Sequence, residues 1–313
     1  MAFPDGIVDA LDPGRLRLLV EVQRKGSISA AAEACQIGQP SATKHLKTLE
    51  AAVGTKLVER HGRTSRLTEA GELVAAHGVR VLDTLTSMQE DLRALNGAQR
   101  GTLALAASTT PGSYVLPLIL QCFAEKHPSV DVDVVIGSST WVAERVAQRD
   151  VALGLAGEVE LPDRVASEPF LDDELVGISA PGALRLRRGR VSTGQLADRT
   201  LLVREYGSST RAVAERYLAR VGYRPAKRWE LDSNEAIKRS VRAGLGIGFV
   251  SRLVVEEELE RRDLVMFRLE GAEPMKRAIQ LLRPAGRDPT PSERAFVATL
   301  SDCCSATISG YNR

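Results

Sequence analysis

Several motifs of enzymes and metal sites are missing from this sequence of 313 residues. It has four cysteines and four histidines, and no two cysteines are spaced as C-x-x-C, which argues against a zinc ribbon or a thioredoxin-type site. No H-E-x-x-H pair, G-x-S-x-G turn or phosphate-binding P-loop occurs, so the motifs of zinc proteases, serine hydrolases and P-loop NTPases are absent. We therefore expect no metal, no cofactor and no enzymatic activity.

Long apolar runs are also missing. No stretch of about 18 apolar residues occurs, and the N-terminus lacks an apolar signal core. The formal net charge is only +2, and charged residues make up 26% of the chain, as is usual for soluble proteins. These features predict a cytoplasmic protein that does not contact a membrane. At roughly 150 residues per domain, the length suggests two or three domains.

The small net charge hides a basic segment between residues 36 and 68. The segment contains six cationic and two anionic residues, a local excess of +4. Such an excess suits a polyanionic partner, although charge alone fits a solvated basic surface equally well. The cations are Lys44, Lys47, Lys56, Arg60, Arg63 and Arg66.

Three short helices are predicted around this segment. Residues 15–25 form the first, ended by Gly26, and "SISAAAEAC" forms the second, with Ser29 as its N-cap. The third, residues 39–53, follows "QIGQP" and carries Pro40 in its first turn. Two helices joined by a short glycine turn, after a supporting helix, indicate a helix-turn-helix. The following "TKLVERHGRTSRLT" predicts a two-stranded wing.

The third helix has two different faces. At about 100° per residue, Ala42, Leu46, Leu49 and Val53 cluster on one side and are expected to pack on the first two helices. The polar side is expected to enter the major groove of DNA, with wing arginines on phosphate or in the minor groove. The predicted DNA-contacting residues are Gln39, Pro40, Ser41, Thr43, Lys44, His45, Lys47, Thr48, Arg60, Arg63 and Arg66.

A long helix is predicted from Thr68 onward, with Thr68 as its cap. Apolar residues then recur in a seven-residue repeat along a helix of about 28 residues, roughly 40 Å long. We interpret this row as a dimer seam, weakened at one position by a glycine. The row consists of Val74, Gly78, Val81, Leu85, Met88, Leu92 and Leu95. "NGAQRG", residues 96–101, then predicts a hinge.

Strands and helices alternate after the hinge. "TLALAAS" (102–108) and "VDVDVVIG" (130–137) predict strands, and helical patterns stand between and after them. The same alternation returns from "LLVRE" (201–205) to "GIGFVS" (246–251). This order predicts parallel sheets with helices on their faces, as one large sheet or two small ones.

Short polar clusters occupy the turns that lead from strands into helices. They are "STTPG" (108–112), "GSST" (137–140), "YGSSTR" (206–211) and "SNEA" (233–236). Ligands of open parallel sheets bind at the carboxyl ends of strands, and helix N-termini there favour anions. An N-cap explains one such residue per turn but not runs of three. The predicted ligand-contacting residues are Ser108, Thr109, Thr110, Ser138, Ser139, Thr140, Gly207, Ser208, Ser209, Thr210, Arg211 and Asn234.

Two other patterns give little evidence of a functional site. "AGLGIG" (243–248) precedes a strand rather than joining a strand to a helix, so Gly244 as a helix end explains it better than a dinucleotide site. Asp172 and Asp173 are adjacent, and neighbouring side chains in an extended chain point opposite ways, so they make a poor acid–base pair.

The run "ISAAAEACQIGQPSATKHLKTLEAAVGTKLVERHGRTSRLTEAG" resembles the N-terminal domain of the LysR-type transcriptional regulators. "GTLALAAS" and "SNEAIKRSVRAGLGIGFVS" resemble the C-terminal part of the same family. The resemblance implies an α/β fold class with an all-α N-terminal part. The expected parts are a winged helix-turn-helix, a long linker helix and an effector module of two α/β subdomains similar to periplasmic binding proteins.

The resemblance also implies domain limits. A winged helix-turn-helix would span 11–68, a dimerising linker helix 69–95 and a hinge 96–101. Effector subdomain one would comprise 102–173 plus 270–303, and subdomain two 174–269. The chain would cross between subdomains near Asp172–Gly177 and Phe267–Gly271.

The implied function is transcription regulation through sequence-specific binding of double-stranded promoter or operator DNA. A small, anionic effector would bind between the subdomains, and the protein would act as a homodimer or homotetramer. Two alternatives stay open. One is a two-subdomain enzyme tethered to a DNA-binding head, and the other is a DNA-binding protein whose C-terminal module senses nothing.

Overall fold

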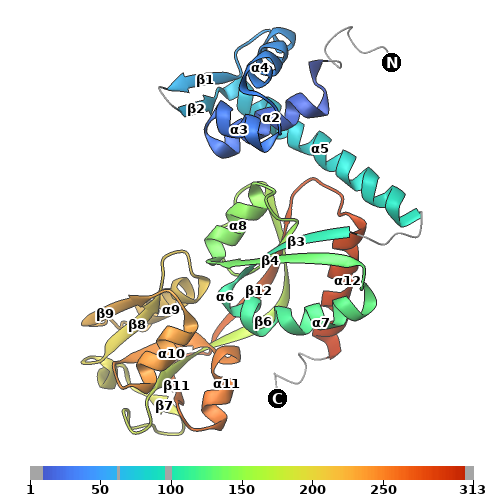
Figure 1. Ribbon diagram of the computed structural model, residues 1–313. Coiled ribbons are helices and arrows are strands. Elements are labelled where there is room, and N and C mark those ends of the chain that lie inside the picture. The colour runs from blue at the N-terminus through green and yellow to red at the C-terminus, as the bar shows by residue number, and fades with distance from the viewer. Residues whose placement is uncertain (1–9, 62–63, 96–100, 307–313) are drawn as a thin grey trace. The chain divides into compact units, whose positions relative to one another are not determined.

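The computed structural model describes residues 10–61, 64–95 and 101–306 (Figure 1). The chain divides into two compact units, Met1–Gly97 and Ala98–Arg313. Within the described ranges, no helix is both long enough and apolar enough to cross a membrane.

The first unit begins with the three predicted helices, α2 (Pro13–Lys25), α3 (Ile28–Ala34) and α4 (Gln39–Val53). α2 and α4 end at Gly26 and Gly54, whose φ angles of 64° and 77° are left-handed and therefore suit glycine. The prediction of Ser29 as the N-cap of α3 is wrong. Ser27 takes that position, because it has the extended backbone of a cap and the helix already begins at the next residue.

The predicted wing is present as the antiparallel pair β1 (Val58–His61) and β2 (Thr64–Leu67). Glu50 of α4 ties the wing to the helices, because its carboxylate accepts hydrogen bonds from the Leu57 N–H (3.0 Å) and from Lys56 Nζ (3.1 Å). Burial acts to raise the pKa of Glu50, but these hydrogen bonds outweigh it, and the pKa is lowered. Apolar residues of all these elements form one buried core.

The long helix is α5 (Glu69–Leu95). Thr68 caps it as predicted, because its hydroxyl accepts a hydrogen bond from the Gly71 N–H (3.0 Å). Gly78 is buried on α2, where an added Cβ would lie 3.3 Å from Leu16. Farther along the predicted seam, Val81, Met88 and Leu92 have exposed fractions of 44%, 51% and 52%. The described residues thus leave the distal half of the seam uncovered.

The second unit is built on one ten-stranded sheet with the order β4-β3-β5-β12-β6-β10-β8-β9; off this path, β11 pairs with β6, and β7 pairs with β11 (Figure 1). Its strands are β3 (Gly101–Ser108), β4 (Val130–Gly137), β5 (Leu153–Gly157), β6 (Val165–Ser179), β7 (Arg190–Val191), β8 (Thr200–Arg204), β9 (Lys227–Leu231), β10 (Ile247–Ser251), β11 (Val265–Leu269) and β12 (Met275–Pro284).

Helices cover both faces of this sheet (Figure 1). They are α6 (Thr109–Tyr114), α7 (Leu116–Lys126), α8 (Ser139–Ala147), the 3₁₀ turn η1 (Thr193–Leu196), α9 (Ser209–Arg220), α10 (Asn234–Arg242), α11 (Arg252–Glu260) and α12 (Pro291–Ala306). The predicted parallel pairing holds for β4-β3-β5 and for β10-β8-β9. β6 and β12 join these groups by antiparallel pairing, so the sheet is mixed.

β6 and β12 divide the unit into two halves, because each runs from one hydrophobic core to the other. In β6, Leu171 belongs to the first core and Leu175 to the second. In β12, Met275 belongs to the second core and Ile279 to the first. The second crossing therefore comes after the predicted Phe267–Gly271, which precedes β12.

Candidate DNA interface and ligand cleft

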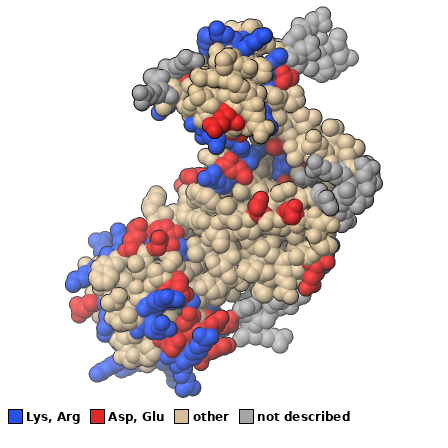
Figure 2. Space-filling view, in the orientation of Figure 1, with Lys and Arg blue, Asp and Glu red and all other residues tan. Residues whose placement is uncertain are grey.

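α4 separates its polar and apolar sides as its sequence predicts. Ala42, Leu46 and Leu49 are buried, which leaves the other face of the helix to solvent. The exposed residues are Gln39, Pro40, Ser41, Lys44 and Lys47, and the half-buried ones are Thr43, His45 and Thr48. Basic side chains are visible on the surface of this unit in Figure 2.

The polar residues of α4 differ in their burial and in whether they already have a partner within the protein. The Thr48 hydroxyl donates to the Lys44 carbonyl (3.0 Å), and Nδ1 of His45 is buried. Lys44 and Lys47 are exposed and form no ion pair with any described residue. In the wing, Arg66 is exposed, whereas Arg63 and the side chain of Arg60 lie outside the described residues.

The second unit contains a polar cleft between its halves. It gathers most of the serines and threonines of three of the four predicted turns, together with charged residues from β8, β12 and the turn after β8. The lining residues are Ser108, Thr109, Thr110, Gly137, Ser138, Ser139, Arg204, Glu205, Ser208, Ser209, Thr210 and Arg277.

Helix capping accounts for only part of this polarity. The Ser138 hydroxyl accepts from the Trp141 N–H (3.2 Å), and the Ser233 hydroxyl accepts from the Ala236 N–H (3.0 Å). Ser108 and Ser208 also occupy N-cap positions, yet their side chains make no cap hydrogen bond. These two hydroxyls line the cleft without a capping role.

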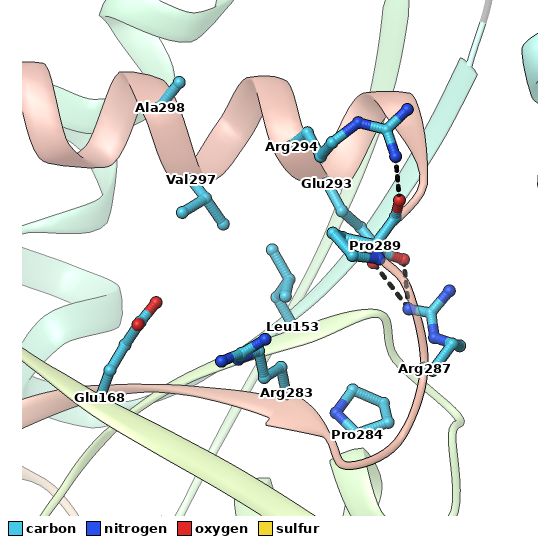
Figure 3. Close-up of a pocket in the computed structure, with 10 residues that line it drawn as sticks. All are labelled: Leu153, Glu168, Arg283, Pro284, Arg287, Pro289, Glu293, Arg294, Val297 and Ala298. Carbon is cyan, nitrogen blue, oxygen red and sulfur yellow. Dashed lines mark hydrogen bonds and ion pairs between the residues drawn. The ribbon is translucent and has the colours of Figure 1, made fainter.

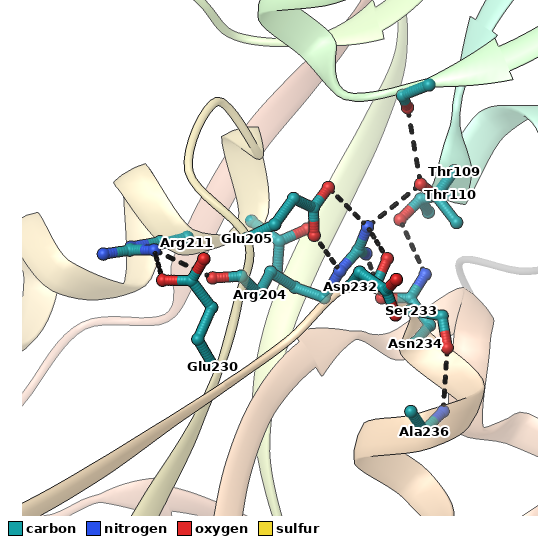
Figure 4. A network of polar contacts seen from close by, with 12 residues as sticks. Thr109, Thr110, Arg204, Glu205, Arg211, Glu230, Asp232, Ser233, Asn234 and Ala236 are labelled. Atoms are coloured by element: carbon teal, nitrogen blue, oxygen red, sulfur yellow. Dashed lines mark hydrogen bonds and ion pairs between the residues drawn. The ribbon is translucent and has the colours of Figure 1, made fainter.

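Arg204 joins the two halves at the end of β8. Its guanidinium is only 3% exposed and donates to both carboxylate oxygens of Glu205 (2.8 and 2.9 Å). It also donates to Asn234 Oδ1 (2.6 Å) and, in the first half, to Thr109 Oγ1 (3.0 Å). Figure 4 shows these partners around the guanidinium. The predicted residue Asn234 thus reaches the cleft through Arg204.

Arg277 enters the cleft from β12. It pairs with Asp173 of β6 (Nε to Oδ2, 2.7 Å), and its Nη1 donates to Ser209 and Thr210 at the start of α9 (3.3 and 3.0 Å). Ser251 donates to the other oxygen of Asp173 (2.6 Å). Nη2 lies 2.7 Å from Asp173 Oδ2 but makes no hydrogen bond with it. Arg277 therefore has a charge partner, and its Nη2 has no well-aligned acceptor among the described residues.

The remaining predicted residues lie beside the cleft. The Thr140 N–H donates to the Gly207 carbonyl (3.1 Å), which links the start of α8 to the turn before α9. Arg211 instead binds Glu230 (2.6 Å) and Glu215 (3.0 Å). Burial acts to lower the pKa of Arg211, but hydrogen bonds to these carboxylates outweigh it and raise the pKa. Arg211 also donates to the backbone carbonyl of Arg204 (3.2 Å), but Arg211 itself does not line the cleft.

Three charged cleft residues were absent from the sequence prediction: Arg204, Glu205 and Arg277. Arg204 and Glu205 end the predicted strand "LLVRE", so the rule that selected the polar turns also applies to them. Arg277 alternates with Met275 and Ile279 on the buried face of β12, and a charge at such a position is a signal for a buried partner.

A second hollow lies where β12 leads into α12 (Figure 3). Arg287 binds both oxygens of Glu293 there (2.6 Å each), and Glu293 exchanges backbone and side-chain hydrogen bonds with Thr290. This is a capping box, so these charges hold the start of the helix. None of the predicted ligand residues lines this hollow.

Two protein-family descriptions match the chain. "Bacterial regulatory helix-turn-helix protein, lysR family" covers residues 13–72, and "LysR substrate binding domain" covers residues 96–304. A curated relative, the RuBisCO operon transcriptional regulator of Allochromatium vinosum, is 32% identical over 90% of this chain and 93% of its own. The transcriptional activator CmpR of Synechocystis is 30% identical over 82% of this chain and 84% of its own.

Solved structures agree with the fold. A full-length OxyR variant of Pseudomonas aeruginosa has a TM-score of 0.70 at 20% identity, over 94% of this chain and 95% of its own. The regulatory domain of Synechocystis CcmR, in complex with 2-PG, has a TM-score of 0.61 at 26% identity, over 66% of this chain and 99% of its own. The predicted fold class is confirmed, and the chain belongs to the LysR family of bacterial DNA-binding transcriptional regulators.

Proposed function

We propose that this regulator responds to a small organic anion bound in the cleft between the two halves of its second unit. The observation that carries the proposal is the convergence of two buried arginines, Arg204 and Arg277, on a cleft lined by hydroxyls. A buried guanidinium needs anionic or strong hydrogen-bond acceptors, and its planar fork matches a carboxylate or phosphate group.

The surrounding backbone supports an anionic ligand. α8 and α9 begin at the cleft lining, and the N-terminal end of a helix carries a partial positive charge and unpaired N–H groups. Nη2 of Arg277, which has no well-aligned acceptor among the described residues, adds a donor. The relative CcmR, whose regulatory domain was solved with 2-PG, makes 2-PG a reasonable first probe.

We assign DNA contact to the exposed side of α4 and to the wing. Lys44 and Lys47 have the freedom that phosphate contact requires, and Ser41 and Thr43 lie near the helix start, where short side chains reach base edges. Replacing Lys47 by Ala should flatten the dependence of log affinity on log salt by about 0.9 if it contacts one phosphate. The matched change is Lys276→Ala, an exposed lysine of the second unit, which should leave the slope unchanged. Identical slopes for both variants would remove Lys47 from the interface.

We assign dimerisation to α5. Its seam continues beyond the core of the first unit as exposed apolar residues, of which Met88 and Leu92 are about half exposed. A seven-residue apolar repeat of this kind is buried when two such helices pair, and a homodimer, alone or within a homotetramer, provides that partner.

A regulatory role also suits the cleft better than catalysis does. Among the residues that the structure describes, no histidine or cysteine lines the cleft, and its carboxylate Glu205 is bound to Arg204. The cleft therefore lacks a nucleophile with an adjacent base. Turnover of any ligand that stabilises the protein would contradict this assignment.

The ligand proposal is tested by calorimetric titration of the full chain with 2-PG, inorganic phosphate and simple dicarboxylates. A free ligand concentration of 100 times Kd should raise the free energy of unfolding by about 2.7 kcal/mol. Arg204→Ala and Arg277→Ala should abolish binding, whereas Arg239→Ala, an exposed arginine of α10, should not. Arg211 is predicted from the sequence to contact the ligand, and Arg211→Ala should weaken binding if it does. Anion binding that survives loss of both cleft arginines would refute the proposed site.

A further inference from the structure

The turn after β8 places a carboxylate in the position that an anionic ligand needs. Both oxygens of Glu205 accept hydrogen bonds from Arg204, from Nε (2.8 Å) and Nη2 (2.9 Å) (Figure 4). This two-point contact is the one that a guanidinium offers to the acid group of a ligand. We propose that Glu205 is a resident competitor of the effector, which the acid group of the effector displaces from Arg204. The inference rests on the proposed function of the cleft.

A comparison of the two cleft arginines shows why Glu205 is the replaceable partner. Arg277 pairs with Asp173, whose side chain is fully buried, held by Ser251 and directly opposite Arg277 in the β6–β12 ladder. The Glu205 side chain is 23% exposed, lies in a turn, and forms hydrogen bonds and an ion pair with Arg204 alone among the described residues. Glu205 can rotate into water, where its charge is solvated, whereas Asp173 has no such route.

The rest of the turn also supplies an acceptor to a donor that an anionic ligand would use. The Gly207 carbonyl accepts from the N–H of Thr140 in the first turn of α8, which is a donor that an anion would also use. Between them Tyr206 is 86% exposed, so outward movement of the turn breaks no apolar packing at that residue. The Glu205 carboxylate thus accepts the hydrogen bonds of Arg204, and the Gly207 carbonyl accepts one from the start of α8. Arg204 and this helix start are both donors that an anionic ligand would use.

This competition defines the class of ligand. A ligand with one acid group exchanges one carboxylate for another at Arg204 and gains little. A ligand with two acid groups gains a second anion contact, at Arg277 and the start of α9 or at the N–H freed on Thr140. The cleft should therefore favour small acids with two acid groups, because only these gain a second contact after they displace Glu205.

The experiment compares Glu205→Gln with Glu230→Gln. Both changes remove one negative charge from neighbouring parts of the second half, but Glu230 binds Arg211 outside the cleft. A glutamine at position 205 has one acceptor oxygen where Arg204 now uses two, so the competitor is weakened. Calorimetric titration of the full chain with inorganic phosphate and with 2-PG measures Kd for the wild type and both variants, with Arg204→Ala alongside.

For Glu205→Gln we expect the Kd of inorganic phosphate to fall at least about tenfold, the size of a lost charged hydrogen bond. The Kd of 2-PG should fall by a similar factor, because both ligands displace the same carboxylate from Arg204. Glu230→Gln should stay within about twofold of the wild type. An unchanged Kd for Glu205→Gln, or an equal fall for both variants, overturns the competitor role while dependence on Arg204 still supports the ligand cleft. Binding that is absent throughout, or independent of Arg204, overturns both proposals.

Discussion

The buried pair of Asp173 and Arg277 leads to a quantitative prediction about stability. Their side chains are 0% and 2% exposed, so neither charge is solvated in the folded protein. In Asp173→Asn the Arg277 cation loses its counter-ion and stays buried. Breaking a buried ion pair in this way costs about 3–5 kcal/mol, and we expect the second unit to lose that amount of unfolding free energy.

The next residue of the same strand provides the control. Glu174 also binds an arginine, Arg268, at 2.6 Å, but these side chains are 19% and 35% exposed. Partly exposed pairs contribute about 0–1 kcal/mol, so Glu174→Gln should change the unfolding free energy by no more than that. The comparison keeps the strand, the type of partner and the change of charge constant and varies mainly the burial.

Urea unfolding followed by tryptophan fluorescence measures this difference. Both tryptophans of the chain, Trp141 and Trp229, lie in the second unit, so the signal reports that unit. Inorganic phosphate should restore part of the stability of Asp173→Asn, because an anion in the cleft can replace the lost carboxylate beside Arg277. Similar losses of about 1 kcal/mol in both variants would refute the reasoning that burial controls the energy of the pair.

Three further predictions concern other parts of the chain. Folding lowers the pKa of Glu50. Its contribution to stability is therefore complete above the unfolded pKa and is lost as the pH falls through the folded pKa. Glu50→Gln should flatten the acid limb of the stability–pH curve of the first unit. Gly207→Ala should destabilise the second unit more than Gly222→Ala by about 1 kcal/mol in urea unfolding, because both have left-handed φ but only Gly207 has side chains within 4 Å of an added Cβ. Met88→Glu places a charge on the exposed seam of α5 and should shift sedimentation toward smaller species, whereas an unchanged assembly would exclude the seam.

The first unit was largely predictable because its signals are local. Gly26 and Gly54 end helices, Pro40 begins one and Thr68 caps one, and each effect depends on a few neighbouring residues. The error at Ser29 is of the same local kind, since two serines two positions apart both suit a cap. The side chain of Ile28, which is buried in the core, decides between them.

The cleft was only half predictable because its charged contacts join distant segments. Arg204 meets Thr109 across 95 positions, and Arg277 meets Asp173 across 104. The polar turns could be found from their place at strand ends, but no local pattern pairs residues so far apart. Asp173 illustrates the limit: the alternation rule correctly separated it from Asp172, yet gave no indication that its partner lies on β12.

The charges of the cleft explain why ligand binding should move the turn after β8. Without a ligand, Arg204 and Arg277 are balanced by Glu205 and Asp173, one carboxylate for each guanidinium. A dianionic ligand adds two negative charges to this balanced set, and in a poorly solvated space the excess is unfavourable. Asp173 cannot leave, so the excess is relieved at Glu205. The same turn carries Gly207, whose carbonyl binds Thr140 of the first half. Release of Glu205 therefore acts on a contact between the halves, and ligand binding becomes a change in how they are joined.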